Sequence, residues 1–561
     1  MLGSADLQQA KLSGASFYEV SFGESNLTGA VISRTRFIDC DITAAQIYST
    51  ASYQNRDLRG IILYSGSLAG WNFAGQDLSQ AELSGSLAGA DFSGAIVAGA
   101  RIGSMSAAQL YSTASYQARD LTGFTAGGAG LQGADLKYQN LRQANFATES
   151  LVQADLAGAH IQQAILTLTA DQLYSTASFQ SHDLTGVNLY GNLNGFNFTG
   201  QNLTGASLHW IGANTDLTEA IIEGATIPRG LTAAQLYSTA SYQQKNLQGV
   251  RFFEQNMVNS TSNFRGWNFA GQNLADANLS WTDLTDADFT GAKIDGIQLW
   301  YANLTSEQLY ATSSYQAGDL SRIYMSSANL DGWNFAGQNL SGARFSHCSL
   351  RGADLSGANL TNASFPAFIY DPELTLIGAN LSGADARGAQ WFTIPPTAQT
   401  NNLIRQDGTV RGLNLGSGET FVVRDYDGDP FYAAGPIAIT VESGLETAGN
   451  SVLRVVLEDD AWNSTISFVA GIPVELGGTL ELSFAEGVDP RTQAGRTFKL
   501  FDWTGVSPSG TFSVSSSHAW DLSKLYSTGE VRLLPVPEPT ASMLGVLGLT
   551  LVWCGRGRRA G

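Results

Sequence analysis

Residues 131–146 read LQGADLKYQNLRQANF, and this stretch decides the fold. Its large apolar side chains, Leu131, Leu136, Leu141 and Phe146, fall five residues apart. An α-helix repeats every 3.6 residues and a strand every two, so neither produces a five-residue period. The period instead predicts a square coil with sides of five residues, in which one large side chain of each side points inward.

The same period covers most of the chain. It runs from Leu7 to Ile42, from Leu131 to Leu166, from Leu274 to Leu309 and from Leu320 to Phe365. A small residue, usually alanine, lies two positions before each apolar centre, and Asp or Asn usually lies one before it. Gly often follows two positions later. One such coil cannot bury its core alone, so the coils must stack.

Two cysteines fit the same pattern. Cys40 and Cys348 each lie two positions before an apolar centre, where a small buried residue is needed. A free thiol behaves there as a small apolar side chain. We therefore predict a structural role for both cysteines and no redox chemistry.

The Ala-Asp/Asn-Leu-x-Gly pattern resembles the pentapeptide-repeat family over about residues 1–391. The resemblance implies an all-β fold, a right-handed quadrilateral β-helix with four pentads in each turn. We assign residues 1–394 to this solenoid.

A longer repeat is superimposed on the pentads. The segment YSTASYQ, or a close variant, begins at Tyr48, Tyr111, Tyr174, Tyr237 and Tyr310. Each copy follows Ser/Thr-x-x-Gln, which is the spacing of a helix capping box. We predict five short helices that interrupt the coils, at about 44–54, 107–117, 170–180, 233–243 and 306–316. They are either docking ornaments or, as we favour, covers for the solenoid wall.

A second signature follows four of these helices. Trp-Asn-Phe or Phe-Asn-Phe occupies residues 71–73, 196–198, 267–269 and 333–335. Each copy is followed by Ala/Thr-Gly-Gln.

The pentads stop past Trp391, and Ile394-Pro395-Pro396 marks a boundary. Segments such as 420–423, 437–441 and 452–457 alternate between apolar and polar residues or are rich in β-branched residues. They predict a smaller all-β domain at 397–534, either sandwich-like or a continuing β-solenoid.

The last segment, residues 535–561, has three parts. Val536-Pro537-Glu538-Pro539 precedes an apolar run from Ala541 to Cys554, and Arg556, Arg558 and Arg559 follow. We predict a short hydrophobic helix whose basic end stays cytoplasmic. The arrangement resembles the PEP-CTERM sorting signal, with Pro537, Glu538 and Pro539 matching the motif. The resemblance implies transient membrane anchorage, processing by an exosortase (a membrane-bound cysteine peptidase) and delivery to the cell envelope or extracellular space.

An exported chain is expected to begin with a signal peptide. Met1-Leu2-Gly3-Ser4 leads straight into the first pentad. We therefore expect that the true start lies upstream or that the chain is a fragment.

The composition gives little support for catalysis or nucleic-acid binding. The net charge is −19, whereas a nucleic-acid binder needs a basic surface. The five histidines show no metal-ligand spacing. Asp425, Asp427 and Asp429 alternate around Gly428 as a candidate calcium loop, with a solvated turn as the favoured alternative. We expect no enzyme and no cofactor.

Some pentapeptide-repeat proteins mimic DNA and block topoisomerases, and charge density tests that role. Residues 1–396 hold 18 Lys and Arg against 31 Asp and Glu. Spread over about 18 coils, the excess is less than about one negative charge per coil, whereas duplex DNA carries nearly three over the same rise. The negative charge density of the repeat region is therefore too low to imitate DNA well.

We therefore predict a non-enzymatic exported structural or interaction protein. Its polar surface, with exposed Tyr and Trp, suits extracellular polysaccharide or surface proteins. The alternative is an intracellular pentapeptide-repeat effector that binds a protein partner.

Overall fold

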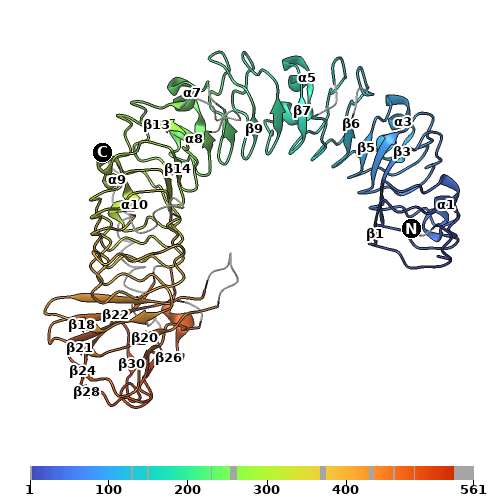
Figure 1. Cartoon of the computed structure of the whole chain (residues 1–561). Coiled ribbons are helices and arrows are strands. Elements are labelled where there is room, and N and C mark those ends of the chain that lie inside the picture. The colour runs from blue at the N-terminus through green and yellow to red at the C-terminus, as the bar shows by residue number, and fades with distance from the viewer. Residues whose placement is uncertain are drawn as a thin grey trace, which may run out of the picture. The chain divides into compact units, whose positions relative to one another are not determined.

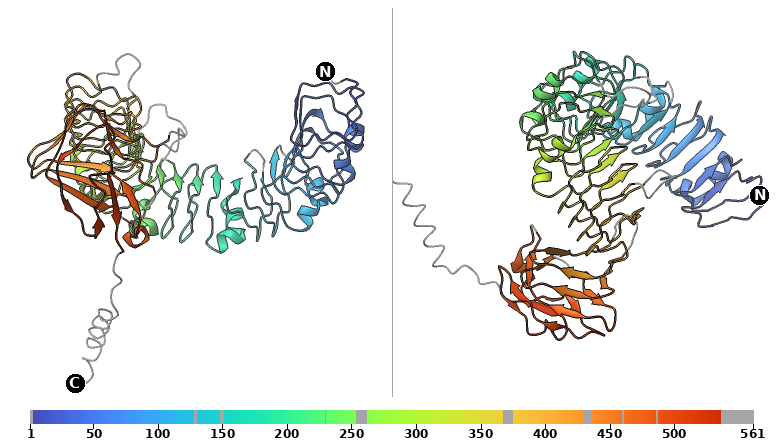
Figure 2. Two further views of the ribbon diagram at one scale, coloured as in Figure 1. Left: turned by 90° about the horizontal axis from the view of Figure 1, so that it is seen from below. Right: turned by 60° about the vertical axis from the view of Figure 1, so that its left-hand side comes forward.

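The computed structural model describes residues 3–127, 130–147, 151–228, 230–252, 262–366, 375–428, 435–458, 461–485 and 487–535. The chain divides into two compact units, residues 1–298 and 299–561. Figures 1 and 2 show the stacked coils of unit 1 in blue to green and the strands at the end of unit 2 in orange and red.

The coils of unit 1 stack through parallel backbone pairing. Asp6 pairs with Asn26, Lys11 with Val31, and Ser16 with Arg36, so the first coil pairs with residues 20 positions later. Twenty residues are four pentads, and each pentad therefore supplies one side of a coil. The chain adopts the β-helix type of repeat fold that the five-residue period predicts.

Short parallel strands mark one side of these coils. The first sheet contains β1 (Ser16–Tyr18), β2 (Arg36–Ile38), β3 (Ile62–Ser67), β4 (Glu82–Ser86), β5 (Arg101–Gly103) and β6 (Thr125–Gly127), in that order. The second contains β7 (Ile165–Thr167), β8 (Asn188–Tyr190), β9 (Ser207–Leu208), β10 (Thr226–Ile227) and β11 (Arg251–Phe252). On a different side of the coils, β12 (Ser262–Asn263) pairs with β13 (Thr282–Asp283).

The predicted interior is confirmed. Leu131, Leu136, Leu141 and Phe146 are all 0% exposed. Ala134, two positions before a centre, is also buried. The large centres and small partners therefore fill the coil together, as in a close-packed core.

The Asp or Asn before each centre shapes the corner of the coil. The Oδ1 of Asp77 accepts a hydrogen bond from the backbone N–H of Ser79 at 2.9 Å, and the Oδ1 of Asn72 accepts one from Ala74 at 2.8 Å. These are Asx-turns, which satisfy a backbone donor that the bend leaves free. The glycine two positions after a centre, such as Gly133 at φ +68°, takes the left-handed conformation at the same corner.

Each predicted helix is in fact a pair of short helices. The pairs are α1 (Ala44–Tyr48) with α2 (Ala51–Gln54), α3 (Ala107–Ser112) with α4 (Ala114–Gln117), α5 (Ala170–Ser175) with α6 (Ala177–Gln180), α7 (Ala233–Ser238) with α8 (Ala240–Gln243), and α9 (Ser306–Tyr310) with α10 (Ser313–Gln316). The predicted capping box is present at the start of all five pairs.

A threonine divides each pair. Thr113 is extended, at φ −72° and ψ 148°, and caps α4 by accepting a hydrogen bond from the N–H of Tyr116 at 3.1 Å. Its hydroxyl also donates to the carbonyl of Leu110 at 2.7 Å, which closes α3. The prediction of one continuous helix was wrong because this hydroxyl competes with the helical backbone.

Unit 2 begins with further pentapeptide coils. The strands β14 (Gln298–Trp300), β15 (Tyr324–Ser326) and β16 (Arg344–Ser346) form a parallel sheet. Parallel bridges then join Asn380 to Gln399 and Asp385 to Ile404. Coil-like pairing thus continues past residue 394, into the segment where the sequence indicates the second domain.

The C-terminal part of unit 2 is a three-sided parallel β-solenoid. One side contains β17 (Thr409–Val410), β20 (Ile439–Val441), β23 (Ile466–Phe468) and β27 (Phe501–Asp502). The second contains β18 (Leu413–Leu415), β21 (Leu445–Thr447), β24 (Val474–Leu476) and β28 (Ser509–Gly510). The third contains β19 (Thr420–Arg424), β22 (Val452–Leu457), β25 (Thr479–Phe484) and β29 (Ser513–Ser515).

Each coil of this solenoid gives one strand to each side, and the pairs that join successive coils are parallel. Successive coils of this part of the chain thus stack as a parallel β-solenoid. A short 3-10 helix (Pro490–Gln493) and the antiparallel strands β26 (Thr497–Lys499), β31 (Glu530–Leu533) and β30 (Trp520–Asp521) lie beyond β25.

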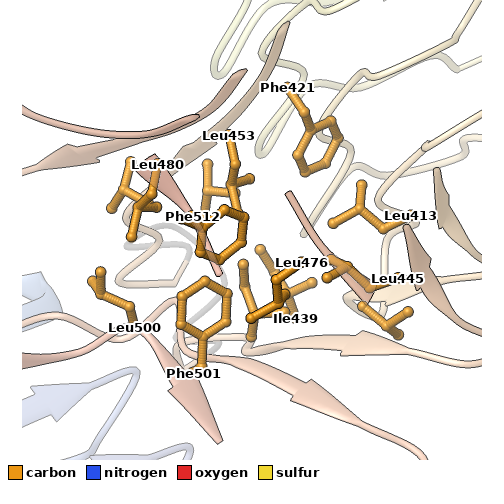
Figure 3. Close-up of a cluster of buried hydrophobic side chains, with 14 of the residues drawn as sticks. Leu413, Phe421, Ile439, Leu445, Leu453, Leu476, Leu480, Leu500, Phe501 and Phe512 are labelled. Carbon is orange, nitrogen blue, oxygen red and sulfur yellow. The ribbon is translucent and has the colours of Figure 1, made fainter. Parts of the chain in front are cut away.

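Leucine, isoleucine and phenylalanine side chains from the three sides form one core, shown in Figure 3. Ile404, from the last pentapeptide-type bridge, belongs to the same cluster. The two solenoids of unit 2 therefore share a hydrophobic core.

A buried ion pair joins these two solenoids. Arg387 is 0% exposed and contacts Asp385 at 2.7 Å. Its guanidinium also donates to the carbonyls of Arg424 and Ile437 at 2.9 and 3.0 Å, and to the Ser464 hydroxyl at 2.7 Å. One pentapeptide side chain thus satisfies three acceptors of the β-solenoid.

Removing the hydroxyl of Thr113 should destabilise its helix pair. Thr113→Val keeps the side-chain shape but loses the cap and leaves buried backbone groups without partners, which we expect to cost about 1–2 kcal/mol. Native-state hydrogen exchange at the α3–α4 amides measures the loss. Thr28→Val, at an exposed position, is the matched control, and an equal effect in both variants would contradict the assignment.

Breaking the buried ion pair should destabilise unit 2. Arg387→Met leaves the Asp385 carboxylate buried and unpaired, at an expected cost of about 3–5 kcal/mol in chemical denaturation. Replacing both residues, as Asp385→Leu with Arg387→Met, removes the isolated charge and should recover part of that loss. A double variant less stable than the single variant would refute this explanation.

Candidate functional site

The repeated polar residues around the helix pairs bind the pairs to the coils. In the second pair, the side-chain carbonyl of Gln109 accepts from the Ser106 N–H at 3.0 Å. The amide of Gln109 donates to the carbonyls of Leu87 and Ala90, both at 2.9 Å. The Ser115 hydroxyl accepts the backbone N–H of Val97, also at 2.9 Å. These bonds fix the helices to the preceding coil.

Two tyrosines fix the same pair to the following coil. The Tyr111 hydroxyl accepts the N–H of Asp135 at 2.6 Å, and the Tyr116 hydroxyl donates to the carbonyl of Asp135 at 2.8 Å. The Gln139 amide then donates to the carbonyl of Tyr116 at 3.1 Å. We call this arrangement the tyrosine clasp.

Equivalent clasps hold the central Asn of the Trp/Phe-Asn-Phe signature. The clasped residues are Asn72, Asn197, Asn268 and Asn334. In the third copy Phe179 replaces the second tyrosine, and only the first hydroxyl is present. Both sequence signatures therefore serve the fold, which supports our interpretation of the helices as wall covers.

The two cysteines of the pentads are buried, as predicted. Cys40 and Cys348 are free thiols inside the coils. Burial raises the pKa of Cys348 to about 11. Its thiol therefore remains protonated and unreactive at neutral pH.

The candidate calcium loop is held by protein groups. Asp425 accepts the N–H of Asn463 at 2.8 Å, and Asp427 accepts its side-chain amide at 2.7 Å. Asp429 lies outside the described residues. Across the described ranges, no group of three or more His, Cys, Asp or Glu is placed to hold a metal ion. Asp425 and Asp427 brace a turn against Asn463.

The residues of the sorting motif, Val536, Pro537, Glu538 and Pro539, lie outside the described residues. The same holds for the basic cluster Arg556, Arg558 and Arg559 and for the predicted hydrophobic helix. Within the part of the chain that is described, no helix has the length and apolar character needed to span a bilayer.

The outer face of the first sheet contains two rows of side chains. The parallel register aligns Arg36, Ile62, Glu82, Arg101 and Thr125 in one row. Two positions later along each strand, the second row contains Tyr18, Ile38, Tyr64, Ser84, Gly103 and Gly127. After Tyr64 the second row continues with the small Ser84 and then with Gly103 and Gly127, which have no side chain, and this opens the surface.

A groove of about 330 Å³ lies where the side chains disappear. Tyr64, Glu82, Ser84, Arg101, Gly103, Thr125, Gly127 and Asn145 are among the residues that line it. The Tyr64 hydroxyl donates to the Glu82 carboxylate at 2.5 Å, and this hydrogen bond raises the pKa of Tyr64 above its ordinary value. We call this feature the β3–β6 groove.

Aromatic pairs occupy the outer faces of two other sheets. Tyr190 on β8 stacks on His209 with ring centres 3.8 Å apart. In unit 2, Trp300 meets Tyr324 edge to face at 4.7 Å. Sequence reasoning noted exposed Tyr and Trp but did not place them on the strand faces.

Stacked five-residue sides with an apolar centre define a β-helix-type repeat protein. The family profile described as Pentapeptide repeats matches the chain in eight copies, which fall within residues 5–43, 129–167, 183–211, 262–305, 319–357 and 328–365. Pentapeptide repeats are therefore identified in these segments of the chain. A search of curated proteins finds no match to the chain.

Solved structures give two comparisons. A trypsin-treated variant of QnrB1, a plasmid-mediated fluoroquinolone resistance protein, is 17% identical, with 38% of this chain and 88% of that chain covered and a TM-score of 0.18. HetL, a pentapeptide repeat protein involved in heterocyst differentiation regulation from the cyanobacterium Nostoc sp. strain PCC 7120, is 22% identical, with 54% and 98% covered and a TM-score of 0.10.

The buried thiols should resist modification while the chain is folded. With Cys554 replaced by serine, we expect Cys40 and Cys348 to react with a thiol reagent at pH 7–8 at least about a hundredfold more slowly than in denaturant, because both are buried and Cys348 is protonated. The time course of reagent release measures this. Rapid reaction of either thiol in the native protein would contradict a structural role.

Proposed function

We propose that this pentapeptide-repeat protein is a non-enzymatic interaction scaffold, exported and sorted to the cell surface through its C-terminal tail. The observation that supports this proposal most is the arrangement of the outer strand face. There a fixed parallel register presents aromatic and hydrogen-bonding side chains in rows. Rigid strands place such groups more reliably than loops do. The same face offers partners a surface that needs no rearrangement.

The use of polar side chains supports a non-enzymatic role. The polar residues that recur among the repeats form hydrogen bonds to the backbone. Examples are Gln109, Ser115, Tyr111 and Tyr116. Asp425 and Asp427 likewise brace a turn. The side chains still available to a partner are those in the outward-facing rows of the strands, and these rows suit binding rather than bond cleavage.

The proposed export rests on the sequence of the tail. Pro537-Glu538-Pro539, the apolar run to Cys554 and the closing arginines stand in the order of a PEP-CTERM signal. In this proposal an exosortase-like peptidase removes the tail after the basic cluster has held it in the membrane. Extracellular polysaccharide or surface proteins are then the partners within reach.

Tail removal can be measured directly. We expect mass spectrometry of the protein purified from its native cells to find a mature C-terminus upstream of the apolar run, near Pro537. A variant with Pro537→Ala and Glu538→Ala should keep the tail, because the motif for the peptidase is gone. Wild-type protein that still ends at Gly561 would refute sorting and favour the intracellular effector that binds a protein partner.

A further inference from the structure

We infer that the β3–β6 groove binds a short stretch of an extended β-1,4-linked glycan. This assigns a ligand class to the interaction scaffold proposed above, and it rests on that role without depending on the export route. The groove, its side chains and its glycine floor each contribute to the inference.

Gly103 and Gly127 form the floor of the groove, and backbone conformation does not explain why glycine occupies these two positions. Most glycines of the coils lie at corners with positive φ, but Gly103 and Gly127 do not. A Cβ at Gly103 would lie 3.6 Å from the Leu83 carbonyl oxygen, and one at Gly127 would lie 3.8 Å from the Gly103 Cα. Both are ordinary contacts, so a larger residue fits the fold. What glycine provides here is open space above the sheet.

The groove is straight because the register is regular. Tyr64 pairs with Ser84, Arg101 pairs with Thr125, and Gly103 pairs with Gly127. Thr125 in turn pairs with Asn145 in the next coil. At about 4.8 Å per coil, the four steps from Tyr64 to Asn145 span about 19 Å. An extended, unbranched chain fits such a path better than a coiled one.

The lining offers both donors and acceptors. Glu82 and Arg101 are neighbours in the register, but the Tyr64 hydroxyl already bonds to the Glu82 carboxylate. Among the described residues, the Arg101 guanidinium forms no ion pair or hydrogen bond, and it is exposed. Its N–H groups are available for ligand oxygens, and Ser84, Thr125 and Asn145 add hydroxyl and amide groups.

A hydroxyl-rich ligand matches this lining better than a charged or apolar one. One acid and one base give the groove no net charge, so no strongly charged ligand is favoured. The Tyr64 ring provides an apolar surface with a polar tip, which suits the face of a sugar ring. Sugar hydroxyls both donate and accept, so they match the whole set.

Adding a peptide as an extra strand is excluded here. Strand addition needs a sheet edge with unpaired backbone groups. The strands β3, β4 and β5 each pair with a strand on both sides. A peptide would have to bind through side chains alone, whereas a glycan binds through its hydroxyls.

The test is calorimetric titration of the full chain with cellohexaose, with maltohexaose as a ligand of the same composition but a curved chain. We expect cellohexaose to bind and maltohexaose to bind at least about tenfold more weakly. Equal affinity for both, or no binding of cellohexaose at millimolar concentration, would overturn the inference.

Three variants locate the site. Gly127→Leu fills the floor and should weaken cellohexaose binding at least about tenfold, and Arg101→Met and Tyr64→Ala should each weaken it about five- to tenfold. Thr167→Leu, at the end of β7 and outside the groove, should leave the affinity within about twofold. Unchanged circular dichroism and melting temperature confirm that each variant is folded.

The outcomes separate this inference from the proposed function. Wild-type binding that survives Gly127→Leu would overturn the groove as the site but leave an interaction scaffold standing. Binding lost equally in Gly127→Leu and Thr167→Leu would also overturn the assignment. The mature C-terminus reports on export by itself, whatever the result with glycans.

Discussion

Parallel backbone pairing between coils is the constraint on which the pentapeptide-repeat region depends. Each coil buries its apolar centres only when the next coil lies over it, so the four sides must stay in register. The offset from Ser16 to Arg36 is four whole pentads, whereas Arg36 pairs with Ile62 because the first helix pair lies between them. A departure from the coil is therefore tolerated only if the chain returns to the same side.

The helix pairs meet this condition through hydrogen bonds to backbone on both flanks. Gln109 reaches back to Leu87 and Ala90, while Tyr111 and Tyr116 reach forward to Asp135. Because these contacts join main chain on both sides, they hold whatever side chain the clasped residue carries. Asp135 takes the place of Asn in the second copy without loss of either bond.

The sequence predicted what depends on local spacing. The five-residue period at Leu131 to Phe146 identified the core, and Ser106-x-x-Gln109 identified a helix start. It did not reveal the break at Thr113, because a threonine inside an apparent helix gives no sign of its own cap. The clasp was also missed, since Tyr111 bonds to backbone 24 residues away. Alternation could not separate a sandwich from a solenoid, because both bury every second residue.

The β3–β6 groove was missed because it is made by absent side chains. Gly103 and Gly127 resemble corner glycines in the sequence, but each directly follows a buried inward residue, Ile102 or Ala126. Corner glycines follow two positions after a centre. Gly103 and Gly127 therefore lie one position after an inward residue instead of two, and this difference in the sequence indicates that they lie on a strand face.

Stacking also sets how acidic the coil surface can become. Residues before the centres lie about one strand spacing apart, where like charges repel. Asn339 donates to Asp319, and Asn359 donates to Asn339, both at 3.0 Å, so asparagine turns repulsion into a hydrogen-bonded ladder. Where two aspartates do stack, as at Asp57 and Asp77, Arg59 lies within 3.8 Å of both. The ladder that shapes the corners therefore also keeps the charge of this coil surface low.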